Sequence, residues 1–118
     1  MLPYSHNSIM TATLEYQLST EPQTRVRIPI EARTEAEKLL AKAHPLSGGQ
    51  IDVTNQYVGV PLVVDVLGAY RARTLKLDPA LDILTLNIAE QILTRGRQTQ
   101  MLDSVTDAHD RVREVYFK

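Results

Sequence analysis

The chain of 118 residues carries 13 basic and 14 acidic side chains, a net charge of −1, and no cysteine. This length suits one domain with a hydrophobic core of its own, whereas the lack of cysteine excludes disulfides, thiolate metal sites and cysteine nucleophiles. The balanced charge excludes a long-range attraction of the whole molecule to nucleic acid or anionic lipid. Because no apolar run reaches the roughly 18 to 20 residues that span a bilayer, we expect no membrane association and a cytoplasmic location.

The N-terminal part of the chain predicts a leader followed by a β-hairpin. Residues 1–10 show no periodicity, so we expect a flexible leader there and a single domain over 11–118. Apolar and polar residues alternate over 12–18 and again over 26–30, which is the period of half-buried strands. The polar segment 19–23 between them is typical of a turn. We therefore expect two antiparallel strands that pair as a hairpin.

A helix and a short β-prone segment follow the hairpin. Apolar residues fall at helical spacing over 31–43, with acidic residues early and lysines late, as the helix dipole favours. His44 and Pro45 are expected to end this helix. In the segment Gln50 to Val60, Ile51 and Val53 alternate with polar residues, which allows a short third strand.

The second half of the chain predicts three helices. Pro61 suits the first turn of one helix, whose apolar face extends to Leu77, and Asp78 with Pro79 suits the start of the next. That next helix, over 79–95, is apolar on nearly all sides, so we expect its neighbours to cover it. The last helix carries an apolar stripe at Met101, Val105, Ala108, Val112 and Val115. Together these elements predict an α+β fold in which an N-terminal hairpin packs on three to four α-helices.

A narrow polar strip interrupts the apolar helix over 79–95. It consists of Asn87, Glu90, Gln91 and Thr94. Asn87 and Glu90 are compatible with a buried polar network or a pocket carboxylate, but a window to solvent is the interpretation that the pattern favours.

The peptide Leu46 to Gln50 reads LSGGQ. It resembles the signature peptide with which ATP-binding-cassette ATPases hold a nucleotide γ-phosphate, which would imply nucleotide binding. That peptide works at the start of a helix and opposite a glycine-rich loop with its lysine. Here the peptide follows a helix, and the chain has no Gly-x-x-x-x-Gly-Lys-Ser/Thr motif. We therefore interpret it as a turn in which Gly48 and Gly49 supply the backbone angles.

The segment TRVRIPI at Thr24 to Ile30, followed by EARTEAEKLL, is similar to the opening of ribbon-helix-helix repressors and antitoxins. The resemblance implies DNA binding, with Arg25 and Arg27 reading base edges in the major groove. The other interpretation is an exposed hairpin face on which these arginines pair with Glu15.

The last helix also holds the one cluster of candidate metal ligands. Asp103, Asp107 and Asp110 share a helix face, with His109 close by, and could offer oxygen ligands to a cation. An acidic first half followed by arginines is equally typical of an exposed helix. We therefore expect no metal and no cofactor. Because no nucleophile, base and acid combination stands out, we expect that the protein is not an enzyme.

The feature that does point to a function is an excess of apolar surface on the helices. We hypothesise a non-catalytic protein-protein interaction protein, an adaptor, regulator or assembly factor, that forms a homodimer through its C-terminal helices. The residues expected to bind the partner are Met101, Val105, Val112, Val115 and Tyr116. The alternative hypothesis is a DNA-binding repressor or antitoxin that uses Arg25 and Arg27.

Overall fold

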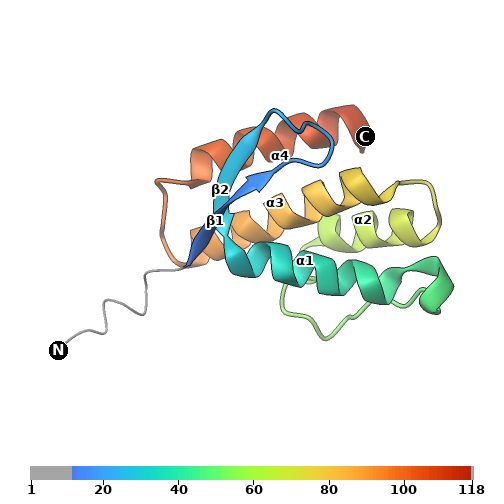
Figure 1. Cartoon of the computed structure of the whole chain (residues 1–118). Helices are drawn as coiled ribbons and strands as arrows, with labels where there is room; N and C mark the ends of the chain where they lie inside the picture. The colour runs from blue at the N-terminus through green and yellow to red at the C-terminus, as the bar shows by residue number, and fades with distance from the viewer. Residues whose placement is uncertain (1–11, 118) are drawn as a thin grey trace.

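A computed structural model describes residues 12–117, which form a β-hairpin followed by helices (Figure 1). The predicted leader at 1–10 lies outside the described residues. The predicted α+β class is confirmed. In chain order the described elements are β1 (Thr13–Gln17), β2 (Arg25–Pro29), α1 (Ile30–Ala43), the 3-10 turn η2 (Pro45–Ser47), α2 (Pro61–Arg71), α3 (Leu77–Arg95) and α4 (Leu102–Tyr116).

The hairpin has the strands that the alternation predicted. β1 and β2 pair antiparallel, with Tyr16 opposite Val26 and Glu15 opposite Arg27. Tyr16 and Val26 lie on the buried face together with Ile28, whereas Glu15 and Arg27 lie on the exposed face. The hydrophobic core therefore holds one face of this two-stranded ribbon, and solvent covers the other.

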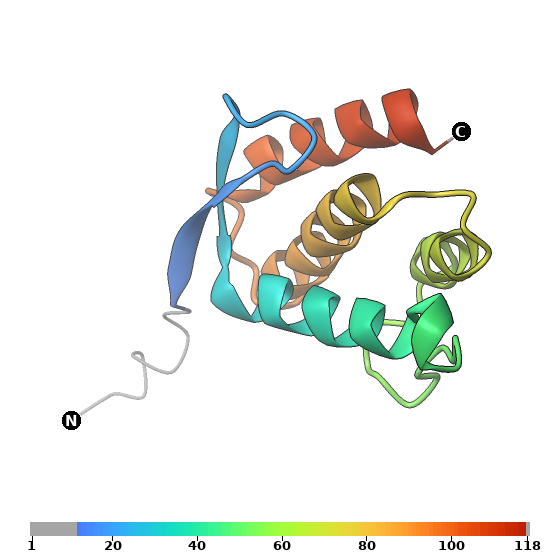
Figure 2. The same ribbon diagram turned by 45° about the vertical axis from the view of Figure 1, so that its right-hand side comes forward.

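Helix α3 is the centre of the fold. It lies between α1 and α4, and α2 packs against it near its N-terminal end (Figures 1 and 2). Ile83, Leu84, Leu86 and Ile88 point in different directions around the helix, yet each is 0% exposed. The prediction that its neighbours cover this helix is confirmed, and the physical reason is that an all-apolar helix is stable in water only when it is surrounded.

The predicted third strand is absent, because the segment 50–60 consists of turns in the part of the chain that the structure describes. The side chain of Asp52 accepts a hydrogen bond from the backbone N–H of Thr54 at 3.1 Å, and the side chain of Asn55 accepts one from the N–H of Tyr57 at 2.8 Å. Such local bonds satisfy the backbone without a neighbouring strand. The alternation of Ile51 and Val53 was therefore misleading.

Two helix boundaries also differ from the prediction. Leu77 was expected on the apolar face of the helix that starts at Pro61, but α2 ends at Arg71 and Leu77 opens α3. Ile30 was expected to point inward from the second strand, but it opens α1 and is 41% exposed. In both cases the prediction assigned an apolar residue to the element that precedes it, whereas that residue is the first of the next helix.

The LSGGQ peptide is a turn, as its residues indicated. Pro45 opens the 3-10 turn η2 directly after α1, and Nδ1 of His44 accepts a hydrogen bond from the N–H of Leu46 at 3.0 Å. Gly48 and Gly49 have φ angles of +97° and +62°, a region that disfavours residues with a Cβ. The peptide follows a helix, whereas the resemblance to the ATPases would need it to open one.

Candidate functional site

The predicted partner-binding stripe of α4 packs mainly against the chain's own core. Val105 and Val112 are only 0% and 2% exposed, because α4 packs against α3 and β2. Met101 is half-buried in the same contact. Val115 and Tyr116, in the last turn, are 64% and 45% exposed. Of the five residues expected to bind a partner, the structure therefore leaves these two on the surface.

The two hairpin arginines lie on the exposed face of β2. Nη2 of Arg27 is 3.5 Å from Oε2 of Glu15, and its Nη1 donates to Oγ1 of Thr13 at 3.1 Å. Arg25 is exposed opposite Gln17. The pairing between Arg27 and Glu15 is the one expected for an exposed hairpin face. The ribbon-helix-helix resemblance implies a strand that pairs with a second copy and a short turn after the first helix. Here β2 pairs with β1 of its own chain, and residues 44–60 separate α1 from α2.

The acidic cluster of α4 is dispersed in three dimensions. Asp103, Asp107 and Asp110 are exposed, and Asp110 pairs with Arg113, whereas His109 points into the core and is 3% exposed. Among residues 12–117, no three histidine, aspartate or glutamate side chains are grouped closely enough to hold a metal ion.

His109 instead joins α4 to α3. Its Nδ1 lies 3.0 Å from Oε1 of Glu90. Burial by itself would raise the pKa of Glu90, but the hydrogen bond and charge of His109, helped by Thr106 and Arg113, hold it below its ordinary value. Glu90 was expected in a window to solvent, but α4 covers much of it.

The rest of the polar strip on α3 holds the loop 50–60. Nε2 of Gln91 donates to the backbone oxygen of Tyr57 at 3.2 Å and to Oδ1 of Asn87 at 2.8 Å. The hydroxyl of Tyr57 donates to Glu31 of α1, and burial followed by this hydrogen bond raises the pKa of the tyrosine. Asn87 is 6% exposed. Asn87 therefore belongs to a buried polar network, which was the second interpretation, whereas Glu90 and Gln91 are half-buried and Thr94 is exposed.

Sequence reasoning missed a second buried carboxylate, that of Asp82 on α3, which is 0% exposed. It accepts hydrogen bonds from the backbone N–H groups of Ser19 and Thr20, both at 2.9 Å, and from Oγ1 of Thr20 at 2.7 Å. The hydroxyl of Tyr16 also donates to it, and burial together with this bond raises the pKa of that tyrosine. With four donors around it, this carboxylate anchors the turn of the hairpin to α3 and is not free for catalysis.

A surface at one end of the helix bundle lies outside these polar networks. There the C-terminal ends of α1, α2 and α4 meet the N-terminal end of α3 (Figures 1 and 2). Three adjoining hollows of about 410, 380 and 240 Å³ lie at this end, and Leu77 lines all of them. We call this region the end surface, and its members are Leu46, Tyr70, Arg73, Lys76, Leu77 and Tyr116.

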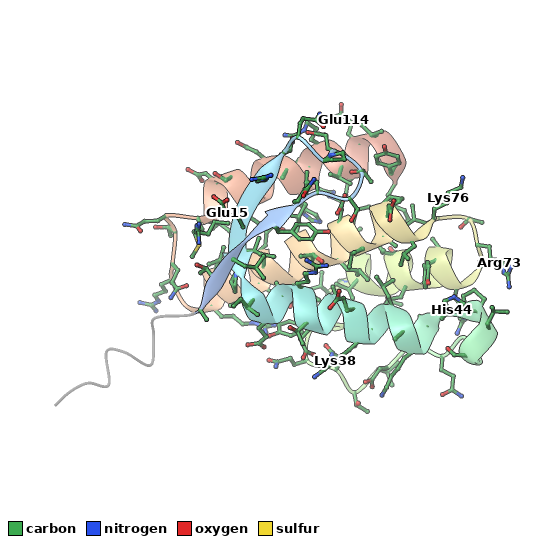
Figure 3. All side chains as sticks on the ribbon, viewed as in Figure 1. Glu15, Lys38, His44, Arg73, Lys76 and Glu114 are labelled. Atoms are coloured by element: carbon green, nitrogen blue, oxygen red, sulfur yellow. The ribbon has the colours of Figure 1, made fainter. Side chains whose placement is uncertain are left out.

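Apolar side chains and positive charge coincide at the hollow of about 410 Å³, whereas the acidic residues Asp78 and Glu37 line the two smaller hollows. Leu46 is 82% exposed and Leu77 is 50% exposed. Arg73 and Lys76 line the largest of the three hollows, and Figure 3 shows both side chains at the same end of the molecule as His44. Within residues 12–117, neither cation forms an ion pair or a hydrogen bond. This surface can therefore bind an apolar group and an anion.

A hollow of about 500 Å³ elsewhere on the molecule offers less chemistry. It lies between the end of α1 and the loop 50–60. Its charged groups are already engaged, because Nζ of Lys42 bonds to Oδ2 of Asp52 at 3.0 Å and Oδ1 of Asp52 bonds to Thr54. The end surface is therefore the better candidate site.

Comparisons with protein-family models, curated proteins and solved structures find no match to this chain. Over the described part of the sequence, none of the helices combines the length and the apolar character needed to cross a membrane.

Proposed function

We propose that the protein is a non-catalytic protein-protein interaction protein, an adaptor, regulator or assembly factor, which binds its partner through the end surface. The observation that carries this proposal is the exposure of Leu46 and Leu77 beside adjoining hollows. Contiguous apolar surface of this kind marks sites of protein interaction. The fold does not use these two side chains in its core, whereas every other leucine and isoleucine of its α-helices except Ile30 is buried or partly buried there.

The two exposed leucines supply part of the free energy that binding requires. Leu46 and Leu77 are 82% and 50% exposed, and full burial of a leucine contributes about 1.5 to 3 kcal/mol. Covering both side chains would therefore contribute about 2 to 4 kcal/mol. Tyr116 adds an aromatic side chain at the edge, of the kind that is enriched at interfaces.

Self-association is a separate part of the proposal. Because Val105 and Val112 are buried in the chain's own core, a homodimer would use Val115 and Tyr116 in the last turn of α4. Sedimentation at tens of micromolar tests this part. A monomer at that concentration contradicts the homodimer but leaves a different protein as the partner.

Affinity capture from the native lysate tests the proposed surface. The informative variant is Leu77→Asp, because an acidic residue is tolerated in the first turn of a helix. Ile30→Asp is the matched control: Ile30 also opens a helix and is 41% exposed, against 50% for Leu77, but it lies at the other end of α1, on the order of 20 Å away. We expect Leu77→Asp to lose a partner that Ile30→Asp retains. Equal capture by both variants would contradict the proposal.

The same capture, repeated with nuclease, tests the DNA-binding alternative. A repressor or antitoxin would recover DNA, or partners that nuclease removes. This binding would weaken steeply as the salt concentration rises, and it would also weaken with Arg25→Ala or Arg27→Ala. The pairing of Arg27 with Glu15 favours the protein-binding proposal. We therefore expect the capture to be indifferent to both nuclease and Arg25→Ala.

A further inference from the structure

We infer that the end surface binds an acidic segment of a partner protein, in which a large apolar side chain lies next to a carboxylate. This inference rests on the proposed function and specifies the chemistry of its partner. The apolar side chain would occupy the hollow of about 410 Å³ between η2 and the start of α3. The carboxylate would lie at its rim, against Arg73 and Lys76.

The apolar half of the inference comes from the lining of this hollow. Leu46 and Leu77 stand at its edges, and Tyr70 and Leu75, both buried, form its floor. The volume accommodates a large side chain together with part of the backbone that carries it. A ligand made only of charged groups would leave this apolar lining in contact with water.

The acidic half comes from the two cations. Most arginines and lysines of the helices have acidic partners in the chain itself, as Arg33 has Glu37, Lys38 has Glu35 and Arg111 has Glu21. Arg73 and Lys76 have none among the described residues; the same is true of Arg25 and Arg97, but Arg73 and Lys76 are the two that line the apolar hollow. Two unpaired cations beside an apolar hollow are complementary to a ligand that brings its own negative charge.

The backbone of Arg73 makes a sharp test feasible. Its φ angle is +65°, in the left-handed region that favours glycine at the end of a helix. Arg73→Gly therefore removes the cation and relieves the backbone at the same time. Arg97 has the same kind of backbone, with φ of +56°, and follows the far end of α3. Arg97→Gly thus matches Arg73→Gly in charge and in backbone but leaves the end surface intact.

The experiment uses two displayed libraries of random twelve-residue peptides, selected on the full chain. One library has free C-termini and the other is joined to its carrier at both ends, so the two distinguish a terminal carboxylate from an Asp or Glu side chain. We expect enriched peptides to place Leu, Ile, Phe or Met within two positions of a carboxylate. Synthetic copies should bind Arg73→Gly at least tenfold more weakly than Arg97→Gly, and Arg73→Gly should melt no lower than the unmodified protein.

Three results would overturn the inference: no enrichment from either library, enriched peptides that lack a carboxylate, or equal binding to the Arg73→Gly and Arg97→Gly proteins. Lysate capture then separates this failure from that of the proposed function. If capture depends on Leu77 but not on Arg73, the end surface binds a partner that is not acidic. If capture does not depend on Leu77, the proposed function fails as well.

Discussion

Replacing Asp82 by asparagine tests how the hairpin is attached to the helices. Oδ1 of this carboxylate accepts hydrogen bonds from the Tyr16 hydroxyl and the Ser19 N–H, and Oδ2 accepts from the N–H and the hydroxyl of Thr20. Asparagine has the same shape but turns one of these oxygens into an NH₂ donor. In either orientation of the amide, one backbone N–H, of Ser19 or of Thr20, then faces another donor.

The expected loss follows from these contacts. A buried donor left without an acceptor costs about 1 to 3 kcal/mol, and the hydrogen bonds that persist lose the strength that the charge gave them, about 1 kcal/mol in all. We therefore expect Asp82→Asn to lower the free energy of unfolding by roughly 2 to 4 kcal/mol, out of the 5 to 15 kcal/mol typical of a domain.

Urea unfolding followed by circular dichroism measures this loss. The control is Asp78→Asn, which changes an exposed carboxylate in the first turn of the same helix and should cost at most about 1 kcal/mol through the helix dipole. A loss below about 1 kcal/mol for Asp82→Asn, or one equal to that of the control, would refute the assigned role of the buried carboxylate.

Three further predictions concern other parts of the fold. The folded-state pKa of Glu90 is lowered from 4.5, so the stabilising effect of this carboxylate is present above pH 4.5 and is lost as the pH falls through the folded-state pKa. The difference in melting temperature between the unmodified protein and Glu90→Gln should therefore shrink in acid. A difference that does not change with pH would contradict this prediction. Arg73→Gly and Arg97→Gly each remove a non-glycine residue with left-handed backbone angles, which relieves about 1 to 2 kcal/mol of strain. Because glycine loses more entropy on folding, the net gain in stability should be about 0.5 to 1 kcal/mol for each variant. Lower melting temperatures would show that the φ angles cause no strain. Val105→Asp should cost more than about 3 kcal/mol in urea unfolding and Val115→Asp less than about 0.5, and equal tolerance would mean that α4 does not pack as described.

The parts of the fold that sequence could predict are those with a local signal. The alternation around Tyr16 and Val26 predicts the hairpin because a strand exposes every second side chain on one face. The apolar residues all around α3 predict a surrounded helix because water would otherwise cover them. Neither inference needs to know where any other element lies.

The parts that sequence could not predict depend on partners far along the chain. Asp82 is a single carboxylate between Leu81 and Ile83, and its donors lie 62 to 66 residues earlier. Its one local signal is a charge between apolar residues, which predicts a buried and fully hydrogen-bonded group. The end surface has no such signal, because Leu46 and Leu77 meet only where the ends of separate helices converge.

The same long-range attachment has a consequence for synthesis on the ribosome. The hairpin is made before α3, and the carboxylate that holds its turn is made 62 residues after Thr20. Helix α3, which fills the centre of the core, also follows α1 and α2. Until α3 leaves the exit tunnel, the apolar faces of the hairpin, α1 and α2 have no core to join. The segment from the hairpin to α2 must therefore wait for α3 before it folds as a unit.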